Sequence, residues 1–139
     1  INKKRIQFVN GMAANDPVST LQIWKFVIDR YPIDGGTCVF FNSRDDRPVR
    51  TKQMIELTLE EIKPDYFIVR GNKVQSTIDK LIPSSPKTKI VVLGLDDSHQ
   101  KFIDNLSILP KDSLIYAIGN QVGAGQEILE LISTYRNHG

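Results

Sequence analysis

The sequence lacks the features on which several common protein classes depend. Its 139 residues contain one cysteine, Cys38, so a disulfide framework within the chain is excluded and a reducing, cytoplasmic setting is expected. No apolar run approaches about 18 residues, and no membrane-spanning helix is predicted. The net charge is only +2, and basic residues are spread along the chain without interleaved aromatic residues. Nucleic-acid binding is therefore not expected.

Motifs for metals and for phosphate loops are also missing. The two histidines, His99 and His138, have no metal-ligand partner at a useful spacing, so neither a metal site nor a catalytic residue is expected in this chain. Asp96-Asp97 is interpreted as a helix cap before the following serine. No Gly-Lys-Ser/Thr triplet occurs, so the chain alone should not hydrolyse ATP.

What the sequence does contain is a regular alternation of short apolar runs and amphipathic segments, over a length typical of one domain. Strands are predicted at Arg5 to Asn10, Thr37 to Asn42, Asp65 to Arg70, Lys89 to Gly94 and Ser113 to Gly119. Helices are predicted at Val18 to Arg30, Val49 to Ile62, Lys73 to Ile82, Ser98 to Leu106 and Gly125 to Asn137.

The strands are almost continuously apolar, as in Ile90 to Leu93, which is typical of a parallel sheet covered on both faces. The predicted fold is α/β: a three-layer, Rossmann-like domain with a mostly parallel sheet of about five strands and helices on both faces. The loops that follow parallel strands meet at one carboxyl edge, where such sheets hold their ligands. Functional residues are therefore sought in those loops.

The first of these loops, Asn10 to Thr20, is rich in small and amide residues and leads straight into a helix. Such a loop allows a ligand to approach the backbone closely, and a helix start offers free N–H groups to an anion. An ordinary capped helix, with Asp16 as N-cap and a proline at the first helical position, explains the same residues.

The second loop carries three arginines and two aspartates within seven residues, Arg44 to Arg50. Arg44, Arg47 and Arg50 are candidates for binding phosphate or carboxylate, with Asp46 holding a guanidinium in position. Asn42 lies at the end of the preceding strand. A solvated run of surface charges remains the alternative.

The third loop, Gly119 to Glu127, is another glycine-rich turn between a strand and a helix, and it contributes Asn120 as a candidate. It does not have the dinucleotide-binding spacing, and a plain glycine turn would explain it. Three permissive loops at one edge indicate a ligand site better than any one of them alone.

These three loops carry a resemblance to a known family. The matching blocks are Phe8 to Gly11, Ala13 to Asp16, Ser19 to Leu21 and Ile23 to Lys25; then Asn42, Arg44, Asp46-Arg47 and Arg50-Thr51; and finally Tyr116, Gly119-Asn120 and Gly123-Ala124. In this order they resemble the carboxy-terminal domain of the ligase subunit of bacterial poly-γ-glutamate (capsule) synthases, which are related to the Mur ligases. The resemblance spans nearly all of the chain, although Pro64 to Lys111 contributes mostly pattern.

The resemblance implies an ATP-dependent ligase that forms γ-linked polyglutamate through an acyl phosphate. Residues 1–139 would be its single carboxy-terminal domain, a fragment that closes over ATP and glutamate or polyglutamate. The missing amino-terminal and central domains would hold ATP and Mg²⁺, neither of which this fragment would hold alone. Asn15, Ser19 and Thr20 match the loop that faces the nucleotide. The implied partners include membrane subunits of a capsule synthase complex, which would place the parent protein at the inner face of the membrane.

A stand-alone receiver or flavodoxin-like domain does not fit the sequence. A receiver domain would need acidic residues after the first strand, and a flavodoxin would need a hydroxyl-rich phosphate loop there, whereas Asn10-Gly11 follows that strand. A non-catalytic docking or regulatory module of a capsule-synthesis membrane complex is the alternative that the sequence leaves open.

Overall fold

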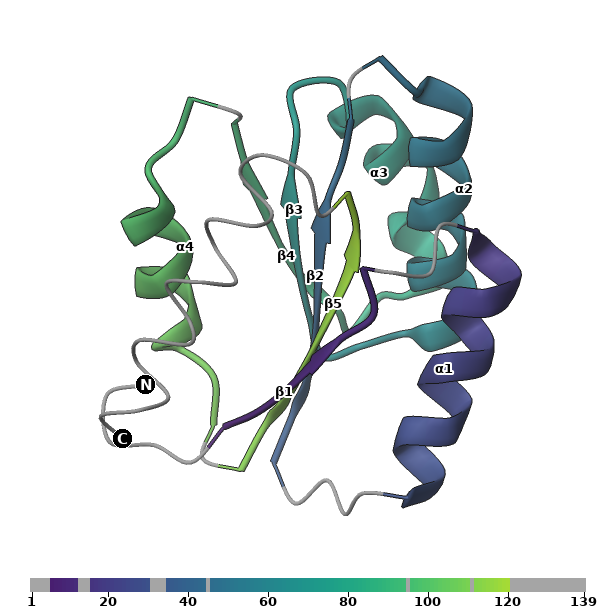
Figure 1. Ribbon diagram of the computed structural model, residues 1–139. Helices are drawn as coiled ribbons and strands as arrows, with labels where there is room; N and C mark the ends of the chain where they lie inside the picture. The colour runs from purple at the N-terminus through teal and green to yellow at the C-terminus, as the bar shows by residue number, and fades with distance from the viewer. Residues whose placement is uncertain are drawn as a thin grey trace.

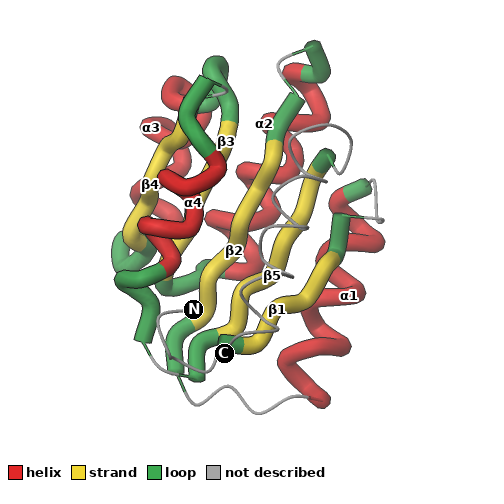
Figure 2. Tube along the Cα trace, turned by 60° about the vertical axis from the view of Figure 1, so that its left-hand side comes forward, coloured by secondary structure: helices red, strands yellow, loops and turns green. Residues whose placement is uncertain are grey.

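The five predicted strands form one parallel sheet. The computed structural model describes residues 6–12, 16–30, 35–44, 46–94, 96–110 and 112–120. Its strands are β1 (Gln7–Asn10), β2 (Thr37–Asn42), β3 (Tyr66–Arg70), β4 (Lys89–Leu93) and β5 (Leu114–Gly119). Their order across the sheet is β1-β5-β2-β3-β4, as Figure 2 shows, and every neighbouring pair is parallel. The predicted α/β class is confirmed.

Helices cover both faces of this sheet, unequally. They are α1 (Pro17–Arg30), α2 (Pro48–Leu57), α3 (Gln75–Leu81) and α4 (His99–Leu106). In Figure 1, α1, α2 and α3 lie on one face and α4 lies on the other. The connections from β1 to β4 all step in one direction across the sheet, so right-handed crossovers place their three helices on the same face. The return from β4 to β5 reverses that direction and puts α4 opposite.

The central strand β2 divides its apolar side chains between two cores. Val39 and Phe41 belong to the cluster beneath α1, α2 and α3, while Cys38 and Phe40 belong to the cluster beneath α4. Phe40 packs against Phe102 of α4, with ring centroids 4.2 Å apart. Successive strand residues point to opposite faces, so a continuous apolar run is what a strand covered on both sides requires.

Helix α1 packs on the sheet through a narrower stripe than its composition suggests. Thr20, Trp24 and Val27 are buried, at the spacing of one helical face. The apolar spacing of the sequence would place Phe26 and Ile28 on the same side of the helix, but they are 54% and 45% exposed, because both fall outside the stripe that touches the sheet. Trp24 is a core residue.

Element boundaries differ modestly from the sequence-based ones. The helix expected to run to residue 62 is α2 followed by a π-helical segment, η1 (Thr58–Ile62). The third helix starts two residues later than expected and ends in a 3₁₀ turn, η2 (Ile82–Ser84). The helix expected at residues 125–137 lies outside the described residues. No helix in the part of the chain that the structure describes is long and apolar enough to span a membrane.

Candidate functional site at the carboxyl edge

The carboxyl ends of three adjacent strands are joined by one asparagine. Asn42, the last residue of β2, is 2% exposed. Its Nδ2 donates to the carbonyl oxygen of Asn120, 2.7 Å away, and its Oδ1 accepts from Nη1 of Arg70 at 3.2 Å. The Asn120 amide also donates to the Asn42 carbonyl at 2.8 Å. Asn42 therefore links the end of β3 to the loop after β5, and direct ligand contact by Asn42 or Asn120 stays a prediction.

Two glycines let these strand ends approach so closely. Gly119 has φ of +96°, and a Cβ there would overlap the Asn42 carbonyl oxygen. A Cβ at Gly71 would overlap Oγ of Ser43, which donates to the Arg70 carbonyl oxygen at 2.8 Å. The loops after β2, β3 and β5 thus depend on residues without side chains at these two points.

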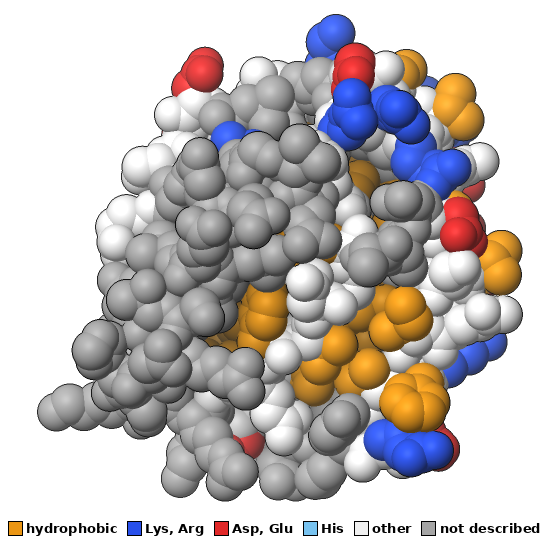
Figure 3. Space-filling view, viewed as in Figure 1, with side chains coloured by type: hydrophobic (Ala, Val, Ile, Leu, Met, Phe, Trp, Pro, Cys, Tyr) orange, Lys and Arg blue, Asp and Glu red, His pale blue; other side chains and the backbone are white. Residues whose placement is uncertain are grey.

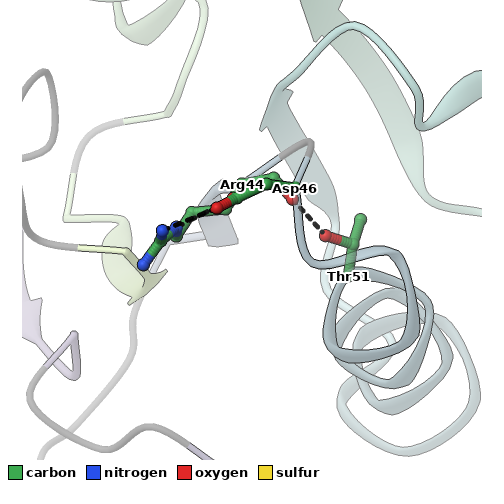
Figure 4. A network of polar contacts seen from close by, with 3 residues as sticks. All are labelled: Arg44, Asp46 and Thr51. Carbon is green, nitrogen blue, oxygen red and sulfur yellow. Dashed lines mark hydrogen bonds and ion pairs between the residues drawn. The ribbon is translucent and has the colours of Figure 1, made fainter.

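Arg44 is held by both its side chain and its backbone. Its Nε and Nη2 donate to the two carboxylate oxygens of Asp46, at 3.0 and 2.7 Å. Its carbonyl oxygen accepts from the Arg47 amide and from Oγ1 of Thr51, both at 3.1 Å (Figure 4). The hydrogen bond and charge of Arg44 lower the pKa of Asp46. The expected clamp of an aspartate on an arginine is therefore present.

Arg47 and Arg50 differ from Arg44 in forming no salt bridge with any described residue. Both are exposed. In Figure 3, Lys and Arg side chains gather at the upper right, over the β2–α2 loop and the start of α2. Pro48 begins α2, one residue before the predicted start, and Arg47, its N-cap residue, makes no side-chain capping bond. Contact of Arg47 and Arg50 with an anion stays a prediction.

The start of α1 lies beside this loop. Oδ1 of Asp16 accepts from the Ser19 amide at 2.8 Å, which confirms Asp16 as the N-cap. That bond, and to a smaller extent the charge of Arg50, lowers the pKa of Asp16. Thr20 is buried, and its Oγ1 donates to the Asp16 carbonyl at 2.8 Å. Ligand contact by Ser19 or Thr20 stays a prediction, and Asn15 lies outside the described residues.

Tyr116 of β5 contacts the first turns of α1. The hydroxyl of Tyr116 donates to the Thr20 carbonyl oxygen at 2.8 Å, and its ring stacks on Trp24 with centroids 5.5 Å apart. Burial raises the pKa of Tyr116, so this hydroxyl keeps its proton and remains a donor. The start of α1 is therefore fixed relative to β5.

The acidic pair before α4 is not the cap itself. Ser98 is the N-cap residue, and its Oγ accepts from the Lys101 amide at 3.3 Å. Asp97 instead closes the preceding turn, because its Oδ2 accepts from the Gly94 amide at 2.7 Å, and it forms an ion pair with Lys101 at 3.3 Å. No group of three metal-ligating side chains occurs among the described residues.

Arg70 is the residue of this edge that sequence reasoning missed. It is 9% exposed, and its hydrogen bond to Asn42 spans two strands. Its position in the sequence could have indicated this role, because Arg70 is the charged last residue of an otherwise apolar strand, β3, and lies at the carboxyl edge of the sheet. Asn42 and Asn120 are brought together at this edge, as predicted. Arg70, at the end of β3, is hydrogen-bonded to the same asparagine, Asn42.

Comparison with known proteins assigns the chain to a family. Residues 1–135 match the family model described as the poly-gamma-glutamate synthase CapB C-terminal domain. The chain belongs to that family. The resemblance found in the loop motifs is thereby confirmed for the whole domain.

Two characterised relatives contain this domain within longer proteins. The PGA synthase CapB of Bacillus subtilis (strain 168) is 35% identical over 134 residues, which cover 93% of this chain and 33% of that protein. The capsule biosynthesis protein CapB of Bacillus anthracis is 30% identical over 125 residues, covering 90% of this chain and 27% of that protein. The chain thus spans about a third or less of the length of these relatives.

A solved structure has the same fold. The MurF ligase from Thermotoga maritima, determined in complex with ADP, aligns with a TM-score of 0.51 at 16% identity. The alignment covers 91% of this chain and 29% of MurF. At this identity the likeness shows the fold alone, a Rossmann-like domain that makes up a minor part of a ligase.

Proposed function

We propose that this domain closes the active site of an ATP-dependent ligase that joins glutamate units through γ-amide bonds, by way of an acyl phosphate. The observation that carries the proposal is the family match over residues 1–135 of a chain whose arginine loop lies at the ligand edge of the sheet. The name of the B. subtilis relative, PGA synthase, supports the product, and the ADP in the related MurF fold supports the nucleotide.

The chemistry assigned to this domain is binding and enclosure. An acyl phosphate is hydrolysed by water, so a domain that closes over it protects the intermediate and orients the attacking amine. Arg47 and Arg50 are exposed and free of salt bridges to described residues, which fits contact with oxygens of phosphate or carboxylate.

Mg²⁺ and the groups that activate the carboxylate are assigned to the rest of the parent protein. Among the described residues no cluster of metal-ligating side chains offers a site for the ion. The fragment alone is therefore expected to be inactive. Partnership with membrane subunits of a capsule synthase, and a position at the inner face of the membrane, are parts of the same proposal, supported by the capsule-biosynthesis name of the B. anthracis relative.

The test is phosphate release by the full-length parent protein that depends on both ATP and glutamate. Arg44→Ala and Arg47→Ala should each reduce this activity without changing the unfolding midpoint. Arg30→Ala is the matched control, because Arg30 is an exposed arginine at the far end of α1, where it lies over the Phe26 ring at 4.6 Å. Its activity should equal that of the wild type.

The outcome separates two roles for this domain. Loss of activity in folded loop variants, with the control unaffected, supports a place in the catalytic cleft. Full activity in both loop variants would contradict that place and favour a docking module within a capsule-synthesis complex.

A further inference from the structure

Within the part of the chain that the structure describes, the ion pair between Arg44 and Asp46 leaves one edge of the guanidinium without a hydrogen bond. A guanidinium presents N–H pairs along a side edge, formed by Nε and one Nη, and along an end edge, formed by the two Nη atoms. Asp46 occupies the side edge through Nε and Nη2. The Arg44 side chain is 42% exposed, and in Figure 4 it points away from α2. The end edge can therefore take a second planar anion.

The direction of this edge is determined by the fold. Three hydrogen bonds hold the backbone around Arg44: the Arg47 amide and the Thr51 hydroxyl bond to its carbonyl oxygen, and the preceding Ser43 amide bonds to the carbonyl oxygen of Arg70 at 3.0 Å. Asp46 then fixes the plane of the guanidinium. An anchored backbone with a clamped side chain is the arrangement that preorganises a binding group.

Charge distinguishes Arg44 from its neighbours. Together Arg44 and Asp46 carry no net charge, so the pair contributes geometry more than attraction, whereas Arg47 and Arg50 keep their charge. Carboxylate and phosphate both match a two-donor edge in shape, but a polyvalent phosphate depends more on net positive charge, which the Arg44–Asp46 pair does not supply. The open edge of Arg44 is thus better suited to a carboxylate than to the phosphates of a nucleotide.

We propose that the end edge of Arg44 binds a carboxylate of the glutamate substrate, and that Asp46 is a positioning residue that acts only through Arg44. This inference rests on the proposed function and specifies which arginine contacts which substrate. Arg47 and Arg50 would then contribute attraction for anions in general.

The experiment measures KM for glutamate and KM for ATP separately in the full-length parent protein. Asp46→Asn keeps Arg44 but removes the charge-assisted clamp, and Arg44→Lys keeps the charge but removes the fork. Each should raise KM for glutamate by about 10-fold or more, the size of a lost hydrogen bond to a charged group. KM for ATP should stay unchanged. The double variant should be no worse than Arg44→Lys alone, because Asp46 acts through Arg44.

A matched control lies on the next helix. Glu56 pairs with Lys52 on the exposed side of α2 at 3.9 Å, and Glu56→Gln should leave both KM values unchanged. Unfolding midpoints of all variants should equal that of the wild type, since both Arg44 and Asp46 are exposed.

The possible results separate the two levels of the argument. If the wild-type parent releases no phosphate with ATP and glutamate, the proposed function fails and takes this inference with it. If the wild type is active but the variants keep their KM for glutamate, or raise KM for ATP instead, only the inference is overturned. Additive effects in the double variant would also overturn the role of Asp46.

Discussion

Asn42 is the position where one substitution should disturb the candidate site most. Its amide connects the loop after β5 with Arg70 at the end of β3, from a position on the central strand that is 2% exposed. Asn42→Ala removes both side-chain bonds and leaves the buried Arg70 guanidinium and the half-buried Asn120 carbonyl with one partner fewer. The domain should become less stable, and the loops after β2 and β5 should separate.

The magnitude follows from the two bonds. The bond to the Asn120 carbonyl joins neutral groups and is worth about 1 kcal/mol, while the bond from the Arg70 guanidinium involves a charged donor and is worth about 1.5–3 kcal/mol. Because neighbouring contributions are not strictly additive, we expect a loss of about 2–4 kcal/mol in the free energy of unfolding.

Urea unfolding of the purified chain would measure this loss as a lower midpoint at an unchanged m-value. Asn105→Ala is the matched control, because Nδ2 of Asn105 also donates to a carbonyl, that of Lys101 at 2.8 Å, but at an exposed position. The control should cost less than about 0.5 kcal/mol. A loss below about 1 kcal/mol for Asn42→Ala, or one equal to the control, would refute the linking role of Asn42.

Three further predictions concern other parts of the domain. Gly119→Ala should lower the free energy of unfolding by about 1–3 kcal/mol, because the residue has φ of +96° and no room for a Cβ; in the same urea assay Gly36→Ala, whose Cβ would meet its nearest atom at 3.4 Å, should cost less. Ser98→Ala should cost about 1 kcal/mol by removing the N-cap of α4, and Ser98→Asp should restore it; a neutral Ser98→Ala would contradict the capping role. Burial raises the pKa of Cys38 from 9.0 to about 12, so the unfolded state loses this proton first and stability should fall as pH rises from about 9 to about 12. The Cys38→Ala variant should show a smaller fall, and an equal fall would assign the effect to other groups.

Most of the fold could be predicted because its signals are local. The run from Cys38 to Phe41 is apolar at every position, which is typical of a strand covered on both faces. Asp16 and Pro17 predict the start of α1, because the N-cap hydrogen bond of Asp16 and the fixed φ of Pro17 act within the first turn of the helix. The exposure of Phe26 could not be predicted in this way, because composition counts apolar residues but does not show which stripe of α1 meets the sheet.

The candidate site was predictable in part for the same reason. Arg44 and Asp46 are two residues apart, so their pairing follows from the chemistry of neighbouring fork and carboxylate. The match of loop motifs to the poly-γ-glutamate synthase family also needed no coordinates. The order of the strands could be determined only from the coordinates, because a parallel sheet can place β5 in several positions.

The sequence by itself therefore determined the class of fold, the family and the edge of the sheet at which a ligand site is predicted, since periodicity, turn residues and motifs are properties of short segments. Only the tertiary structure decided that Arg70, Asn42 and Asn120 form one hydrogen-bonded connection. These residues are 28 and 78 positions apart in the chain. They meet because β2 lies between β3 and β5, and that neighbourhood results from packing helices on both faces of the sheet.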